Sequence, residues 1–122
     1  MPIYDGFIYQ PPLDPLDIIF EDADFVAINK PAGLLSVPGR LAEHHDSAYF
    51  RVLDLFPNAK ITHRLDMATS GIILFAKHRD AEVAASKMFQ ARTIKKNYIA
   101  LVQGKINSNG SVEVPLITDW EN

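Results

Sequence analysis

The sequence predicts an α+β domain, with a mixed, mainly antiparallel sheet and two helices packed on it. Short β-branched and aromatic runs of strand length recur along the chain. Two other stretches repeat their apolar residues at helical spacing, and turn-forming residues separate all of these runs. With 122 residues, 48% of them hydrophobic and 22% charged, the chain is long enough to bury one core, so we expect a single domain.

The first 16 residues contain four prolines, which lack a backbone donor and disfavour regular structure. We therefore expect residues 1–16 to form an extended arm and residues 17–122 to form the folded part. The folded part opens with two apolar runs, Ile18–Phe20 and Phe25–Ile28, separated by four mainly acidic residues. This pattern predicts a β-hairpin.

A loop is expected over residues 31–40, where glycines and prolines alternate with apolar residues. Gly33 and Gly39 permit a positive φ or a close backbone approach to a ligand. The two leucines between them are expected to close the core. Arg40 follows at the loop tip, where a guanidinium is free to contact a phosphate group.

The first predicted helix covers Ser47–Phe56, where apolar residues stand at positions i, i+4, i+7 and i+8. Asp46 or Ser47 is the expected N-cap, and Pro57 ends the helix. The apolar stripe consists of Ala48, Val52, Leu55 and Phe56.

A second helix is predicted over Asp80–Arg92, with His78 or Asp80 near its N-cap. Its apolar face has small side chains, so the helix can lie close against a sheet. The members of this face are Ala81, Ala84, Ala85 and Met88.

Three further strands complete the predicted sheet. Ile72–Ala76 is a continuous apolar run, as expected for a buried strand. Lys95–Gln103 alternates, so that Tyr98 and Ala100 share one face, and Ser111–Val114 follows a Ser-Asn-Gly turn. Tyr98 is then either the wall of a functional site or a core tyrosine with a bonded hydroxyl.

The densest group of reactive and hydrogen-bonding side chains is His63–Gly71, directly before the predicted buried strand. Asp66 lies two residues after Arg64, and a nearby cation keeps a carboxylate charged when a substrate buries it. Such a carboxylate can act as nucleophile or base on a loop that a core strand holds. The alternative is that Asp66 only caps the turn through its backbone and pairs with Arg64.

The histidines do not predict a metal site. His44 and His45 are adjacent, which is not a usual ligand spacing, and the sequence contains no HExxH-like pair. The chain has no cysteine, so neither a disulfide nor a thiolate metal site is possible. We expect His63 to orient its loop through hydrogen bonds rather than to carry a proton.

The charges are unevenly distributed along the chain. The net charge is −3, and the first 24 residues carry six acids and no base. Residues 60–97 carry eight Lys and Arg against three acids, a local balance of +5. This asymmetry fits a basic face toward a nucleic acid and an acidic back, or simply a solvated face.

Nothing in the sequence predicts membrane insertion. No apolar run approaches the ~20 residues needed to span a bilayer, and the N-terminus has no basic stretch followed by an apolar one. The lack of cysteine fits a reducing compartment. We therefore expect a soluble cytoplasmic protein.

Three stretches resemble the RluA-type RNA pseudouridine synthases. His63–Asp66 followed by Thr69–Gly71 is similar to the family signature. Asn29–Gly39 resembles the segment that precedes this signature in the family, and Lys96–Ala100 resembles its tyrosine-bearing strand. The three lie in the family's order, and the similarity runs from about Asp17 onward.

The resemblance implies a pseudouridine synthase catalytic fold and an enzyme that flips a uridine out of structured RNA before isomerising it. Asp66 would be the catalytic carboxylate, Arg64 would fill the gap left by the flipped base, and Tyr98 would stack on the uracil. His63 and the residues Thr69, Ser70 and Gly71 would shape the loop. The reaction needs no cofactor and no metal.

The apolar loop that ends at Arg40 is most similar to the subgroup acting on both 23S ribosomal RNA and tRNA. The family's second-half motif, which contains a His-Gln-Leu-Arg run, is absent, so we expect the chain to be the N-terminal part of the catalytic domain. Strand edges left unpaired by such a truncation invite a dimer.

Two other functions stay open at this point. A non-catalytic RNA-binding module would bind RNA without isomerising it. A carboxylate hydrolase such as a glycosidase would need a second acid opposing Asp66, which the nearby sequence does not obviously supply.

Overall fold

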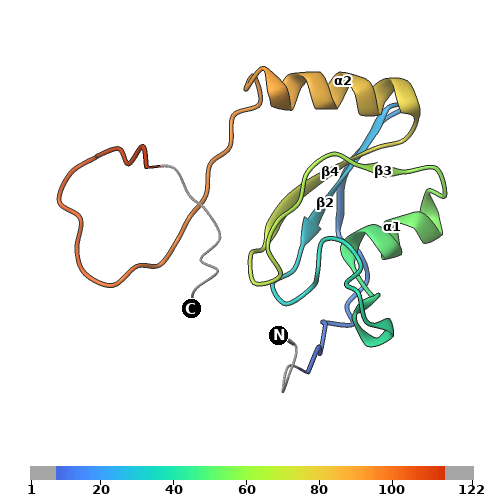
Figure 1. The fold of residues 1–122 in the computed structure, drawn as a ribbon, viewed down its shortest axis with the longest axis horizontal. Coiled ribbons are helices and arrows are strands. Elements are labelled where there is room, and N and C mark those ends of the chain that lie inside the picture. The colour runs from blue at the N-terminus through green and yellow to red at the C-terminus, as the bar shows by residue number, and fades with distance from the viewer. Residues whose placement is uncertain (1–7, 115–122) are drawn as a thin grey trace.

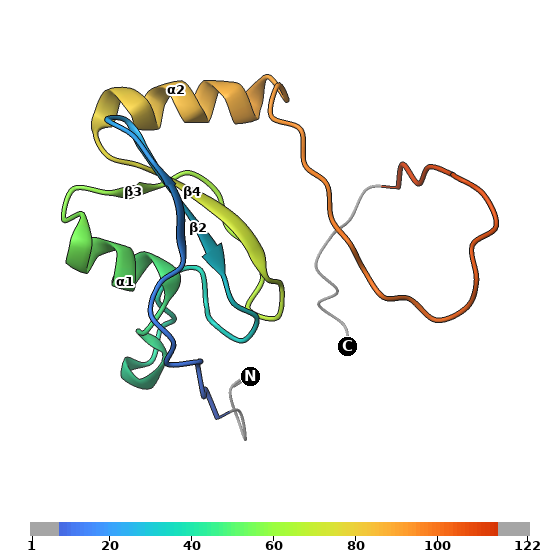
Figure 2. The same ribbon diagram turned by 180° about the vertical axis from the view of Figure 1, so that it is seen from behind.

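The computed structural model of this chain describes residues 8–114, and Figures 1 and 2 show it from opposite sides. A sheet lies at the centre, and the chain beyond the last helix runs out as an extended segment. The rest of the predicted arm, residues 1–7, and residues 115–122 lie outside the described range. The elements in chain order are β1 (Ile18–Glu21), β2 (Phe25–Lys30), the 3-10 helix η1 (Ala42–His44), α1 (Ala48–Leu55), β3 (Lys60–Ile61), β4 (Gly71–Ala76) and α2 (Arg79–Gln90).

The strands form one sheet in the order β1-β2-β4-β3, and every pair of described strands is antiparallel. β4 pairs with β2 along its whole length. On its other side, β4 pairs with β3 only at Phe75 and Ala76, so the edge from Gly71 to Leu74 has no strand partner among residues 8–114. The predicted α+β fold with a mainly antiparallel sheet is confirmed.

The predicted hairpin is formed by β1 and β2, and Asp22 makes its turn. The Asp22 carboxylate oxygen Oδ1 accepts hydrogen bonds from the backbone N–H groups of Asp24 at 2.8 Å and Phe25 at 2.7 Å. These bonds lower the pKa of the Asp22 carboxyl because they favour its charged form. β1 is the edge strand and all four of its residues are exposed.

The core lies between one face of the sheet and α1. Val26 and Ile28 of β2 and Ile73 and Phe75 of β4 are fully buried there, since alternate side chains of a strand point to the same face. The Tyr49 ring of α1 stacks on the Phe75 ring with 5.8 Å between centroids. The sheet and α1 therefore pack around one core, and the loops extend from it.

Helix α1 has the predicted N-cap and most of the predicted stripe. The Ser47 hydroxyl accepts a hydrogen bond from the Phe50 N–H at 3.0 Å. Ala48 and Val52 are buried, but Leu55 is 56% exposed, so its assignment to the apolar face is wrong. Leu55 is the last residue of the helix, and no described part of the chain covers it.

Helix α2 begins after His78, whose Nδ1 accepts a hydrogen bond from the Ala81 N–H at 3.2 Å. Of the four predicted face residues, Ala81 and Ala85 are buried and the other two are exposed. The helix ends at Gln90, two residues before the predicted end, because Arg92 takes a left-handed φ of 57°. α2 contacts β3 and β4 across one end of the sheet.

Residues 91–114 form no helix or strand, so the predicted strands over Lys95–Gln103 and Ser111–Val114 are wrong. The alternating apolar side chains of the first segment face water, and Ile99 and Leu101 are fully exposed. A strand must satisfy its backbone groups on a neighbouring strand, and no described strand pairs with these residues.

The described part of the arm has no regular structure, but side chains fix it to the domain. The Tyr9 hydroxyl donates to the Asp46 carbonyl at 2.7 Å and accepts from the Leu35 N–H at 2.9 Å. Arg51 donates to the Pro12 carbonyl at 2.7 Å while it holds the Asp46 carboxylate through two bonds of 2.9 and 2.8 Å. The arm is thereby attached to the loop that follows β2.

Candidate active site

The motif loop, residues 63–70, leads from β3 into β4, and Asp66 stands near its middle. The Asp66 carbonyl accepts a hydrogen bond from the Thr69 N–H at 3.0 Å, which closes a turn. The side chains of Asp66 and Arg64 are both exposed, and neither forms an ion pair with any residue in the described range. The backbone turn is therefore present, and the alternative pairing of Asp66 with Arg64 is not.

Leu65, just before Asp66, is held by both its side chain and its backbone. The side chain belongs to the core cluster. The Leu65 N–H donates to the Ser36 hydroxyl at 3.0 Å, and that hydroxyl donates to the Leu65 carbonyl at 2.5 Å. One side chain therefore satisfies both backbone polar groups of the residue before Asp66.

Met67, just after Asp66, is held through its carbonyl. That oxygen accepts a hydrogen bond from Lys30 Nζ at 3.0 Å and another from the Gly33 N–H at 2.8 Å. Asp66 is consequently an exposed residue between two fixed neighbours. The backbone under its carboxylate is held, while the carboxylate itself reaches solvent.

Lys30 is the last residue of β2 and is fully buried. Its ammonium donates to three carbonyls, those of Pro31 at 2.9 Å, Leu34 at 2.7 Å and Met67 at 3.0 Å, which uses all three of its donors. Burial lowers the pKa of Lys30, and the Asp66 carboxylate opposes this shift. The buried cation is thus electrostatically linked to Asp66.

The two glycines of the loop after β2 occupy positions that disfavour a larger residue. Gly33 has a φ of +92°. A Cβ on Gly39 would lie 2.8 Å from the His44 Cβ, closer than packed carbons approach. The predicted positive φ is therefore present at Gly33, whereas Gly39 lies close to His44 and an approach to a ligand stays a prediction. Arg40 follows Gly39, is exposed, and forms no ion pair within residues 8–114.

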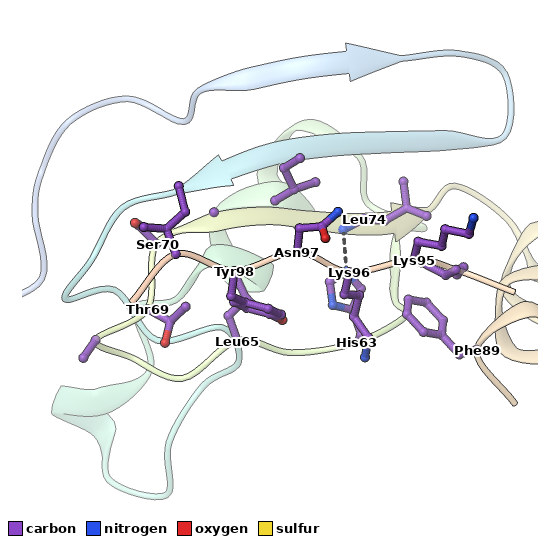
Figure 3. A pocket seen from close by; sticks show the side chains of 15 residues that line it. His63, Leu65, Thr69, Ser70, Leu74, Phe89, Lys95, Lys96, Asn97 and Tyr98 are labelled. Carbon is purple, nitrogen blue, oxygen red and sulfur yellow. Dashed lines mark hydrogen bonds between the residues drawn. The ribbon is translucent and has the colours of Figure 1, made fainter. Parts of the chain in front are cut away.

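A cleft of about 730 Å³ lies along the outer edge of β4, next to the motif loop (Figure 3). Its size is within the range that holds small organic ligands. The motif loop and β4 supply one side, and Phe89 of α2 with the segment after this helix supplies the other. The lining residues are His63, Leu65, Ala68, Thr69, Ser70, Gly71, Ile72, Leu74, Phe89, Ile94, Lys95, Lys96, Asn97, Tyr98 and Ile99.

His63 lines the cleft and supplies a hydrogen-bond acceptor to the unpaired edge of β4. Its Nε2 accepts a hydrogen bond from the Leu74 N–H at 3.1 Å, the dashed line in Figure 3, and Thr62 Oγ1 donates to the Leu74 carbonyl at 2.5 Å. An accepting Nε2 requires the neutral ring with its proton on Nδ1. Burial, and to a smaller extent Lys96, lower the pKa of His63, which favours that neutral form.

The structure brings some of the predicted site residues together and leaves others apart. His63, Thr69, Ser70, Gly71 and Tyr98 all line the cleft. Tyr98 is 63% exposed, so it is not a core tyrosine. The remaining predicted residues, Arg40, Arg64 and Asp66, are exposed but do not line the cleft.

Sequence reasoning assigned no role to three residues that shape this region. Lys30 and Ser36 hold the loop around Asp66, and the Phe89 ring lies 5.0 Å from the His63 ring. Local sequence patterns do not point to these residues, because Lys30, Ser36 and Phe89 contact parts of the motif loop that are distant in sequence.

Residues 8–114 contain no group of three His, Asp or Glu side chains placed to hold a metal ion. In the same range, no helix has the length and apolar character required to cross a membrane.

Comparison with known proteins gives consistent matches. Residues 24–121 match the RNA pseudouridylate synthase family. The dual-specificity RNA pseudouridine synthase RluA of Vibrio parahaemolyticus is 52% identical over 116 residues, which are 93% of this chain and 46% of that protein. Its counterpart of the same name in Escherichia coli is 47% identical over 116 residues, which are 93% of this chain and 53% of that protein. The chain thus spans about half the length of these relatives.

Two solved structures share the fold. Human RNA Pseudouridylate Synthase Domain Containing 1 superposes with a TM-score of 0.52 and 25% identity, over 70% of this chain and 31% of that one. Human RNA Pseudouridylate Synthase Domain Containing 4 gives a TM-score of 0.52 and 27% identity, over 63% of this chain and 30% of that one. The sheet and helices described above therefore correspond to part of such a domain.

Proposed function

Because this chain belongs to the RNA pseudouridylate synthase family, we propose that it converts uridine to pseudouridine in structured RNA, with Asp66 as the catalytic carboxylate. The observation that carries the proposal is the position of Asp66, an exposed carboxylate whose two neighbours are fixed by hydrogen bonds from β2 and from the loop that follows it. A reactive group needs this combination of access and fixed direction.

The reaction breaks the bond between uracil N1 and the sugar's C1′ and forms a bond from C5 to C1′. The hydrogen of C5 is released and N1 gains a proton, so no electrons are gained or lost. The Asp66 carboxylate can attack C1′, attack the base, or remove a sugar proton, and its exposed oxygens suit each of these roles. None of the three requires a metal or a redox cofactor.

The other predicted residues serve the extrusion and binding of the base. We assign Arg64 to the gap that the flipped uridine leaves in the RNA, because its planar guanidinium is exposed and can stack and donate hydrogen bonds together. Tyr98 is assigned to stacking on the uracil in the cleft, and Arg40 to a phosphate. His63, Thr69, Ser70 and Gly71 shape the loop and the cleft wall.

The assignment of Arg64 predicts different losses on different RNAs. Extruding a stacked base costs a few kcal/mol, and less where the base is already unstacked. We expect Arg64→Ala to slow single turnover about tenfold on a structured hairpin and only about twofold on a flexible loop of the same sequence. Equal losses on both RNAs would contradict this role.

We propose 23S ribosomal RNA and tRNA as the substrates, since the similar RluA proteins are named for dual specificity.

A second candidate function is RNA binding without isomerisation. One observation favours it: the segment that carries Tyr98 forms no strand within residues 8–114.

Association of two copies through unpaired strand edges also stays a prediction, which the molecular mass in solution would test.

The test is release of tritium from C5 of labelled uridine in 23S ribosomal RNA and tRNA transcripts, with the 122-residue chain in excess over RNA. RNA binding is measured in parallel by filter retention. We expect both binding and release. Binding without release would favour the second candidate, and absence of both would contradict the proposal.

A further inference from the structure

Ser36 lies 29 residues before Leu65 in the sequence but clamps it in the fold. Its hydroxyl donates to the Leu65 carbonyl at 2.5 Å and accepts from the Leu65 N–H at 3.0 Å. Ser36 is only 4% exposed, so these bonds do not compete with water. A strand would satisfy both groups of Leu65 on a neighbouring backbone, whereas here a single hydroxyl does so.

The clamp is itself anchored to α1. The Ser36 carbonyl accepts from the Tyr49 N–H at 3.0 Å, and the Leu35 carbonyl accepts from the Ala48 N–H at 2.7 Å. These donors belong to the first turn of the helix, whose N–H groups lack partners within the helix. A continuous set of hydrogen bonds therefore runs from α1 through Ser36 to Leu65, the residue directly before Asp66.

We propose that Ser36 is a positioning residue for Asp66, an inference that rests on the catalytic role given to Asp66 above. Ser36 is buried and has no access to RNA, so it acts only through Leu65. Loss of its hydroxyl leaves both Leu65 backbone groups without a partner in the described structure and releases the N-terminal side of Asp66. The reaction rate then falls while RNA affinity stays the same.

Ser47 provides a matched control. It is also a buried serine, 0% exposed, and its hydroxyl also accepts a backbone hydrogen bond, from the Phe50 N–H at 3.0 Å. That bond caps α1, whose first turn also anchors the clamp, but the Ser47 hydroxyl does not bond to Leu65 or to the motif loop. Ser36→Ala and Ser47→Ala therefore remove similar groups from similar surroundings, but only the first touches the residue before Asp66.

The first measurement is amide hydrogen exchange by NMR on the whole chain and both variants. We expect the Leu65 amide to exchange at least about tenfold faster in Ser36→Ala, relative to the amides of β4, and to change much less in Ser47→Ala, which keeps both bonds of the Ser36 hydroxyl. The Phe50 amide should exchange faster in Ser47→Ala, which removes its acceptor, and should be little changed in Ser36→Ala. If Ser36→Ala does not fold, Ser36→Cys keeps nearly the same volume with a thiol that bonds only weakly, and the same change is expected. An unchanged Leu65 amide in the folded variant would overturn the proposal.

The second measurement is single-turnover tritium release at saturating RNA. Ser36→Ala should be about 10- to 100-fold slower with an unchanged dissociation constant for RNA, since small displacements of a catalytic group are costly. Ser47→Ala, which keeps both bonds between Ser36 and Leu65, should lose much less of the rate. Equal rates for the two variants would overturn the positioning role. Absence of release by the unaltered chain would instead count against the proposed function, and the exchange measurement would still decide whether the clamp exists.

Discussion

The motif loop and the segment after α2 are both irregular, yet only the first is fixed. In the motif loop, side chains of Lys30, Ser36 and His63 bond to backbone groups of the loop or of the strand it enters. In residues 95–103 the sequence alternates as a strand should, but its apolar side chains are exposed and no strand within residues 8–114 pairs with it. Order in an irregular segment therefore depends on partners elsewhere in the chain rather than on local pattern.

The largest difference in unfolding free energy is expected between a lysine that holds the motif loop, Lys30, and a lysine of the segment after α2, Lys95. Lys30→Met should lower the free energy of unfolding by about 3 kcal/mol, because three carbonyls lose their buried donor. Lys95→Met, in the exposed segment, should change it by less than about 0.5 kcal/mol. Urea unfolding of both variants measures this. Similar values for the two would show that the Lys30 bonds do not hold the loop.

A glycine that bonds to the motif loop and a glycine of the segment after α2 give a smaller contrast at nearly the same φ. Gly33 has a φ of +92° and Gly104 a φ of +98°. Gly33→Ala should cost about 1–2 kcal/mol of unfolding free energy, because the bond to Met67 prevents its backbone from relaxing. At Gly104 an added Cβ would meet nothing within 4 Å, and the segment can relax, so we expect a cost within about 0.5 kcal/mol. An equal cost at both positions, again from urea unfolding, would contradict the comparison.

The smallest expected effect is a pH dependence at His63, where the two regions meet. Burial and Lys96 lower the folded-state pKa of His63 below its unfolded value of about 6.5. As the pH falls, the unfolded chain therefore takes up a proton on His63 before the folded chain does. The contribution of His63 to the unfolding free energy is complete above about pH 6.5 and is lost as the pH falls toward the folded-state pKa.

The matched control for this effect is His63→Gln, whose amide oxygen can accept the Leu74 hydrogen bond without titrating. Between pH 7 and pH 5.5, the unfolding free energy of the unaltered chain should fall more steeply than that of the variant. The two proteins differ only at position 63, so the difference between their profiles isolates His63. Identical pH profiles would contradict the assigned shift.

The sequence predicted the parts of the fold that local pattern determines. The hairpin, both helices, the central strand β4 and the caps at Ser47 and His78 follow from short-range apolar spacing and capping chemistry, and all are confirmed. β3 was missed because Lys60 and Ile61 are too few to show any period, and they are extended only because β4 pairs with them.

The site was less predictable than the fold. A family-like motif pointed to Asp66, Arg64 and Tyr98, but the bonds that fix the motif loop join residues 29 and 37 positions apart in the sequence. No periodic pattern reports contacts at such separations. The strand predicted around Tyr98 failed for the same reason, since alternation gives a segment the capacity to pair but does not supply a partner.

The central claim is that the carboxylate held between Leu65 and Met67 carries the chemistry. The most direct measurement compares single-turnover tritium release by the unaltered chain, by Asp66→Asn and by Asp54→Asn, which changes an exposed aspartate on α1. We predict that Asp66→Asn is slower by at least about 1000-fold with unchanged RNA binding, and that Asp54→Asn stays within about twofold. An Asp66→Asn variant that isomerises uridine within about tenfold of the unaltered chain would contradict the claim.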